Sequence, residues 1–191
     1  GKTHIINAIA NRIIEINPKL KIKFRTAKKL MDEMISLMKV NRISDFHVNY
    51  TEDVDVLIVD DIQEFRNKEG TQEQFLLIIK ELQRTGKQII YASDLVPEKL
   101  SGISNKVITQ FKKSLVVDIQ SPDLETSVSI LEEFSRKINF TISKINLVAV
   151  AENTERNPAK LEGALLRIKA ASELLNIEIH EEFIKKELSL I

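Results

Sequence analysis

A nearly continuous apolar run that ends in two adjacent aspartates constrains the fold of this chain most strongly. The run is Val54-Asp55-Val56-Leu57-Ile58-Val59, and Asp60-Asp61 follows it directly. A strand with one wet face alternates apolar and polar side chains, whereas a strand covered on both faces is apolar almost throughout. Because a strand covered on both faces is typical of a parallel sheet flanked by helices, the run predicts an α/β fold.

Helical and strand periodicities alternate around this run over the first 120 residues. Strands are expected at 21–25, 54–59, 88–93 and 115–119, and helices at 3–16, 27–38, 43–50, 71–85 and 103–111. The helix at 71–85 is expected to begin with a capping box at Thr71. After residue 120 only helical periodicity remains, at 124–138, 143–152, 158–175 and 180–190. The sequence therefore predicts an α/β core over residues 1–120 and a helical domain over residues 121–191.

Composition excludes several classes of protein. The chain has 191 residues and no Cys, so disulfides, thiol catalysis and Cys-ligated zinc are excluded. Its longest apolar runs are far shorter than the ~20 residues that a membrane-spanning helix needs. The three histidines, His4, His47 and His180, are widely separated and lack the spacing of metal ligands. These features fit a cytoplasmic protein.

The net charge of zero is a cancellation between segments. Residues 1–43 hold 10 basic and 3 acidic residues, a balance of +7, whereas residues 44–73 hold 2 and 9, a balance of −7. The basic segment could face phosphates and the acidic segment could hold a cation. The alternative is that both are solvated helix faces whose charges happen to cluster.

Two short motifs point to nucleotide chemistry. Gly1-Lys2-Thr3 at the start of a helix matches the end of a P-loop, in which the Lys and the helix amides hold phosphates and the Thr hydroxyl ligates Mg²⁺. The triplet alone is common by chance, but acids at the carboxyl end of a buried strand are what P-loop enzymes add to it. Asp60 would then support Mg²⁺ through its water shell, and Asp61 would orient or deprotonate the attacking water. Otherwise the two acids only solvate a strand end and begin a turn.

Ser93-Asp94 follows the next predicted strand, so it is expected at the same edge of the sheet. A polar side chain there could sense the γ-phosphate and position water. The alternative is a helix N-cap, for which Ser and Asp are well suited.

Five strings follow one another over essentially the whole chain: GKTHIINAIAN, VDVLIVDDIQEF followed by GTQEQF, GKQIIYASD, LVVDIQSPDLET and RNPAKLEGALLRI. Together, and in this order, they resemble the AAA+ domain of the DnaA family of bacterial replication initiators. The resemblance implies an AAA+ P-loop NTPase core with a parallel sheet, whose first strand is missing from this chain, followed by an all-helical lid. It also implies binding of ATP and Mg²⁺, slow hydrolysis at most, and head-to-tail self-association on origin DNA. A replicative helicase or another initiator would be further partners.

The resemblance assigns roles to particular positions. The positions that match Walker A, and so bind the nucleotide, are Gly1, Lys2, Thr3 and His4, with Thr3 also a metal ligand. Asp60 and Asp61 match Walker B, and Asp94 falls in the sensor 1 region. The basic helical insert of initiators, about Ala27 to Tyr50, would face single-stranded DNA through Lys28, Lys29, Ile35, Lys39 and Arg42.

Four positions depart from the family pattern. Gln110 stands where the family has its arginine finger, and Lys106 stands at the preceding arginine of the family. Ala159 stands at the sensor 2 arginine, and Gly70 stands at a basic residue that contacts DNA. Neutral Gln cannot stabilise charge as a guanidinium does. The chain is therefore either a divergent initiator or a DnaA-like regulator that binds an initiator and alters its nucleotide state. A helicase loader is a third reading, which the lid string LEGALLRI disfavours.

The ends of the chain suggest a fragment. It opens on Gly1-Lys2-Thr3-His4 without an initiator Met, and no origin-reading helix-turn-helix follows Ile191. By itself the chain is therefore not expected to recognise duplex origin sequence.

Overall fold

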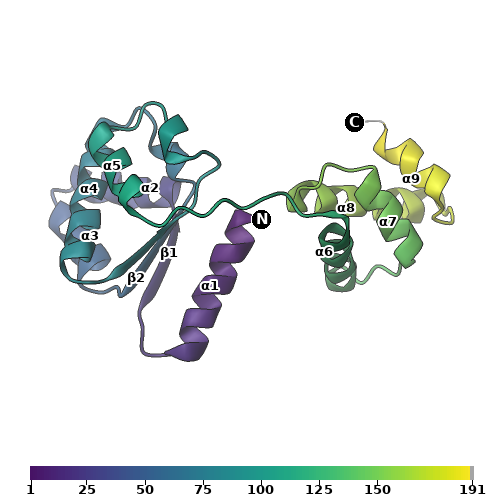
Figure 1. The fold of residues 1–191 in the computed structure, drawn as a ribbon, viewed down its shortest axis with the longest axis horizontal. Helices are drawn as coiled ribbons and strands as arrows, with labels where there is room; N and C mark the ends of the chain where they lie inside the picture. The colour runs from purple at the N-terminus through teal and green to yellow at the C-terminus, as the bar shows by residue number, and fades with distance from the viewer. Residues whose placement is uncertain (190–191) are drawn as a thin grey trace. The chain divides into compact units, whose positions relative to one another are not determined.

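The structure is a computed structural model that describes residues 1–189. The chain forms two compact units, one over residues 2–117 and one from residue 118 onward (Figure 1). Each unit has its own hydrophobic core.

The first unit is a parallel α/β sheet with helices on both faces. Its elements are α1 (Lys2–Ile16), β1 (Ile22–Thr26), α2 (Ala27–Lys39), α3 (Ile43–Thr51), β2 (Val56–Asp60), the 3-10 helix η1 (Ile62–Phe65), α4 (Glu69–Arg84), β3 (Gln88–Tyr91), the 3-10 helix η2 (Pro97–Lys99) and α5 (Asn105–Lys113). The strands pair in the order β1-β2-β3, all parallel. The predicted parallel sheet is confirmed.

The apolar run that opened the sequence argument forms β2, which is buried on both faces. Because side chains alternate along a strand, Leu57 and Val59 enter the core that contains α2 and α4. Val56 and Ile58 enter a smaller core with Ile6 of α1. Figure 1 shows α1 on one side of the sheet and the other helices of this unit on the opposite side.

Two predictions for this unit were wrong. Residues 115–119 form no strand: within residues 1–189 their backbone has no neighbouring strand, and Leu115 is 91% exposed. A strand needs an adjacent chain to accept and donate its hydrogen bonds, so a short apolar run is not sufficient by itself. The capping box at Thr71 is also absent, because α4 begins earlier, at Glu69, and the Thr71 hydroxyl donates to the Lys68 carbonyl.

The second unit is entirely helical over its described residues, as predicted. Its helices are α6 (Leu124–Lys137), α7 (Lys144–Glu152), α8 (Pro158–Leu175) and α9 (Glu181–Leu188). Their first turns are capped by the side chains of Asp123, Ser143, Asn157 and His180. The last predicted helix extended to Leu190, which lies outside the described residues. None of the helices in residues 1–189 has the length and apolar character needed to cross a bilayer.

A buried tyrosine ties β1, α2 and α3 together. Tyr50 is 1% exposed, and its hydroxyl donates to the Glu33 carboxylate. The Arg25 guanidinium donates to the same carboxylate at 2.9 Å. Burial, followed by the hydrogen bond to Glu33, raises the pKa of Tyr50 above its ordinary value.

This raised pKa predicts a loss of stability in alkali. The folded state holds the Tyr50 proton at a pH where the unfolded chain, with a pKa of about 10, has released it. The contribution of Tyr50 is therefore complete below pH ~10 and is lost as the pH rises above it, at up to about 1.4 kcal/mol per pH unit. Urea unfolding between pH 8 and 11 measures this slope. We expect Tyr50→Phe to reduce this slope. Tyr91, whose pKa burial also raises, should contribute to what remains. An unchanged slope in the variant would contradict the assignment.

Candidate functional site

The candidate site lies where the strands end and α1 begins. Thr26 of β1 lies opposite Asp60 of β2 in the sheet register, and Ala92 donates its backbone N–H to the Val59 carbonyl. The carboxyl ends of neighbouring parallel strands therefore meet at one edge. Asp60, the last residue of β2, is 2% exposed at this edge.

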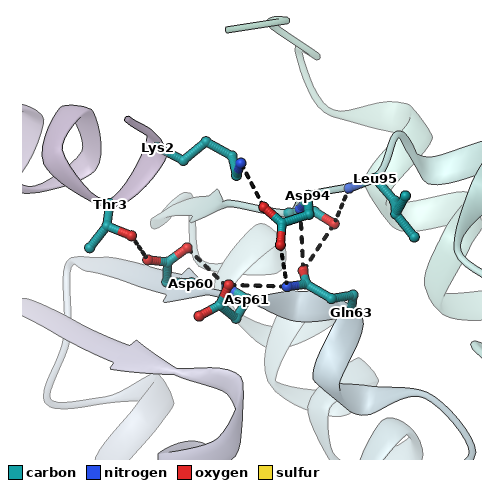
Figure 2. Close-up of polar contacts among 8 residues, drawn as sticks. Lys2, Thr3, Asp60, Asp61, Gln63, Asp94 and Leu95 are labelled. Carbon is teal, nitrogen blue, oxygen red and sulfur yellow. Dashed lines mark hydrogen bonds and ion pairs between the residues drawn. The ribbon is translucent and has the colours of Figure 1, made fainter. Parts of the chain in front are cut away.

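The first turn of α1 contacts this edge through two side chains. The Thr3 hydroxyl donates to Asp60 Oδ2 at 2.7 Å, and the Lys2 ammonium lies 2.7 Å from Asp94 Oδ1 (Figure 2). The structure thus brings together Lys2, Thr3, Asp60 and Asp94, which the sequence placed on three separate segments. An ammonium, a hydroxyl and carboxylates at a helix N-terminus can bind phosphate and a hard cation together.

Asp61 adopts a left-handed backbone conformation, with φ of 57°. Asp is among the few residues that enter this region with modest strain. Its backbone N–H donates to Asp60 Oδ1 at 2.9 Å, and its Oδ1 accepts from Gln63 Nε2 at 3.0 Å. This turn carries Asp61 beyond the end of β2 and keeps its carboxylate beside the other acids.

Gln63 is a site residue that the sequence argument missed. Its Nε2 lies 3.0 Å from Asp61 Oδ1 and 3.3 Å from Asp94 Oδ2, and its Oε1 accepts from the Ser93 hydroxyl at 3.2 Å. Figure 2 shows its side chain between the two acids. The string DDIQ contained the signal, but a Gln in a 3-10 turn has no pattern that marks it as functional.

The alternative reading of Ser93-Asp94 as a helix N-cap was wrong. The next helix, η2, is preceded by Val96 and has no side-chain cap. Ser93 Oγ instead accepts from the Leu95 N–H at 3.1 Å and forms a local turn. Asp94 is left to face Lys2.

The other predicted nucleotide and metal residues are placed as follows. Gly1 and His4 are exposed at the start of α1. Within residues 1–189 no group of three or more His, Cys, Asp or Glu side chains is arranged to hold a metal by itself. Thr3 and Asp60 supply two adjacent oxygen donors, which fits Mg²⁺, an ion that completes its shell with phosphate oxygens and water.

The predicted DNA-contacting residues are only partly brought together. Ile35 and Lys39 of α2 line a groove of about 510 Å³, together with Met38, Lys68, Glu69, Gly70 and Thr71. Lys28 and Lys29 are exposed on the first turn of α2 and do not line it. Arg42 forms an ion pair with Asp45 at 2.5 Å. Lys68 joins the groove without having been predicted, because its place beside α2 depends on the turn after β2.

Comparison with known proteins identifies the family. Residues 1–118, more than half of the chain, match the bacterial DnaA ATPase domain. The chain therefore belongs to the bacterial DnaA family. The predicted α/β fold with an AAA+ core is confirmed, and the chain contains a DnaA-type AAA+ module.

Solved structures agree with this assignment. Domain III of the replication initiation protein DnaA from Thermotoga maritima is 30% identical, with a TM-score of 0.90 over 99% of this chain and 79% of that one. AMPPCP-bound DnaA from Aquifex aeolicus is 32% identical, with a TM-score of 0.77 over 92% of this chain and 54% of that one. A replication initiator DnaA bound to AMPPCP and single-stranded DNA is 29% identical, with a TM-score of 0.77 over 92% and 55%. This chain spans about half the length of the latter two.

Proposed function

We propose that this chain is the ATP-binding module of a replication initiator that self-associates head to tail on origin DNA and engages single-stranded DNA in the cytoplasm. The observation that carries the proposal is the pairing of Thr3 with Asp60 and of Lys2 with Asp94 at the start of α1. Two relatives were solved with AMPPCP, an ATP analogue, which supports a nucleoside triphosphate as the ligand.

The ion pair of Lys2 suggests how the phosphates would bind. The Asp94 carboxylate holds the Lys2 ammonium, although the Asp94 side chain is itself 64% exposed. An exposed pair of this kind contributes only ~0–1 kcal/mol, so it is readily exchanged. A phosphate would take over Lys2 and accept from the amides of the first turn of α1. Mg²⁺, held by Thr3 and supported by Asp60, would neutralise phosphate charge when bound.

Hydrolysis would use Asp61 as the water-orienting acid. The water oxygen would bond to the γ-phosphorus while the bond to the β,γ-bridging oxygen breaks, and ADP would carry that oxygen away. Asp61 would accept the proton that the water releases. Because Gln110 offers no guanidinium for the transferring phosphoryl group, turnover would be slow.

The groove between α2 and the start of α4 is the proposed contact to single-stranded DNA. Ile35 and Met38 expose apolar surface in the groove, and Lys39 and Lys68 supply positive charge beside it. Apolar and cationic groups side by side suit a strand that presents bases and phosphates together. A relative solved with single-stranded DNA supports this ligand.

The DNA proposal predicts a change in salt dependence. Replacing Lys39 and Lys68 by Ala should weaken binding of an oligo(dT) strand about tenfold in 0.1 M salt, because each cation that neutralises a phosphate releases a counterion. The slope of log K against log salt concentration should become shallower by about 1.4, or 0.7 per phosphate. Lys80→Ala, on the exposed side of α4, is the matched control and should leave the slope unchanged. An unaltered salt dependence in the double variant would mean that single-stranded DNA does not bind in this groove.

The second candidate function is a regulator that binds another initiator. Gln110 and Ala159 favour it, because both replace arginines that the family uses toward nucleotide. Mixing the full gene product with a complete initiator separates the two functions. If the protein is an initiator, we expect it to form oligomers by itself in the presence of ATP and not of ADP. If it is a regulator, we expect no such oligomers, and we expect its partner to hydrolyse ATP at a changed rate.

A further inference from the structure

The Gln63 carboxamide bridges Asp61 and Asp94, the second of which pairs with Lys2. Its nitrogen donates to Asp61 Oδ1 at 3.0 Å and to Asp94 Oδ2 at 3.3 Å. Its oxygen accepts from the Ser93 hydroxyl at 3.2 Å and from the Asp94 N–H at 3.4 Å. Both hydrogens of the amide nitrogen and both lone pairs of the oxygen are therefore directed at partners.

This set of partners admits one orientation of the amide. A carboxylate only accepts hydrogen bonds, so the amide nitrogen must face Asp61 and Asp94. A hydroxyl and a backbone N–H lie on the other side, where they suit the amide oxygen. A flip by 180° would turn the oxygen toward two negative charges and the nitrogen toward the Asp94 N–H, which cannot accept. Gln63 is therefore fixed, and it fixes the carboxylates in turn.

Asp61 depends on this bridge. Its left-handed backbone, with φ of 57°, belongs to a turn rather than to a strand or helix. Gln63 provides the hydrogen bond to its side chain. Asp94 has a second partner, the Lys2 ammonium at 2.7 Å, which a phosphate would compete for. When Lys2 turns to phosphate, the contacts to Gln63 remain to hold Asp94.

We infer that Gln63 is a positioning residue that locks Asp61 to Asp94, so that the water-orienting acid keeps a fixed place at the edge of the sheet after Lys2 has turned to the phosphate. The inference rests on the proposed function of the site. It assigns Gln63 to the hydrolytic step and not to nucleotide affinity, since its four contacts are to protein groups and it is not among the groups proposed to bind phosphate. Glu64, the next residue, is exposed in the same 3-10 turn and serves as the matched position.

The test compares Gln63→Ala and Gln63→Glu with Glu64→Ala in the full gene product, by ATP affinity and single-turnover hydrolysis. We expect Gln63→Ala to lower the rate roughly 10- to 100-fold, as misplaced catalytic groups do, with the dissociation constant for ATP changed by less than about threefold. Glu64→Ala should leave both unchanged. In Gln63→Glu the introduced carboxylate faces the carboxylates of Asp61 and Asp94. The hydrolysis rate of this variant should recover as the pH falls, because protonation of the introduced carboxylate restores a hydrogen-bond donor.

Each contrary outcome is distinct. A normal rate in Gln63→Ala, or a Gln63→Glu rate with the pH profile of the wild type, would overturn the inference. A wild type that binds ATP without turning it over would also overturn it, while leaving the binding proposal intact. A wild type that does not bind ATP would overturn both.

Discussion

Replacing Lys2 by Ala is expected to lower the affinity for ATP about 100-fold or more. A lysine that holds β- and γ-phosphates makes a charge-assisted contact in a site that already contains three carboxylates. A 100-fold loss corresponds to about 2.7 kcal/mol, within the range for removing one partner of a charged pair. Without the ammonium, Asp60, Asp61 and Asp94 would oppose the negative charge of the nucleotide with no lysine in the first turn of α1 to offset them.

The fold should survive this substitution. The Lys2–Asp94 pair is exposed to solvent, and surface pairs contribute little to stability. A loss of affinity in Lys2→Ala would therefore report on binding and not on unfolding. Calorimetric titration of the full gene product with ATP and Mg²⁺ measures it. Arg12→Ala, on the exposed side of the same helix, is the control and should bind as the wild type does. ATP bound equally well by Lys2→Ala would remove the basis for the nucleotide site.

The sequence predicted the parts of this protein that depend on local pattern. The apolar run before Asp60 forms β2, and the helical periodicities of the second unit form four helices within a residue or two of the expected ends over the described part. Thr3 meets Asp60, and Lys2 meets Asp94, because a parallel sheet places strand ends at one edge. In each case a local pattern, either an apolar periodicity or a motif at the end of an element, carried the information.

The failures involve residues whose partners are distant in the chain. Residues 115–119 form a short apolar run rich in β-branched side chains, yet a strand forms only beside another strand. Gln63 and Lys68 have ordinary local contexts, and the 3-10 turn after β2 determines what they face. Periodicity describes which side of an element is apolar. It does not specify the hydrogen-bond partners that a turn brings together across about 30 residues, such as Gln63 and Ser93.

A buried glutamine joins that turn to the start of α5. Gln72 of α4 is 1% exposed. Its Nε2 donates to the carbonyls of Phe65 and Gly102, each at 2.9 Å, and its Oε1 accepts from the Ser104 N–H at 2.7 Å. Gly102 has φ of +75°, and a Cβ there would lie 2.4 Å from Asn67 Oδ1, so this loop has little freedom to find other partners.

We expect Gln72→Leu to lower the free energy of unfolding by about 3 kcal/mol. The leucine fills a similar volume but leaves the Ser104 N–H without its acceptor, and an unsatisfied buried polar group costs ~1–3 kcal/mol. The Phe65 and Gly102 carbonyls each lose one hydrogen bond, worth ~0.5–1.5 kcal/mol, and keep those from the Lys68 and Asn67 N–H groups. The midpoint of thermal unfolding should fall by roughly 10 °C for a unit of this size. Gln83→Leu, exposed on the same helix, controls for the change of residue type and should stay within about 0.5 kcal/mol of the wild type. Equal stability of the two variants would mean that the backbone groups around Gln72 find other partners. A selective loss in Gln72→Leu would show that this one side chain holds the turn after β2, and with it Gln63, against the loop that begins α5.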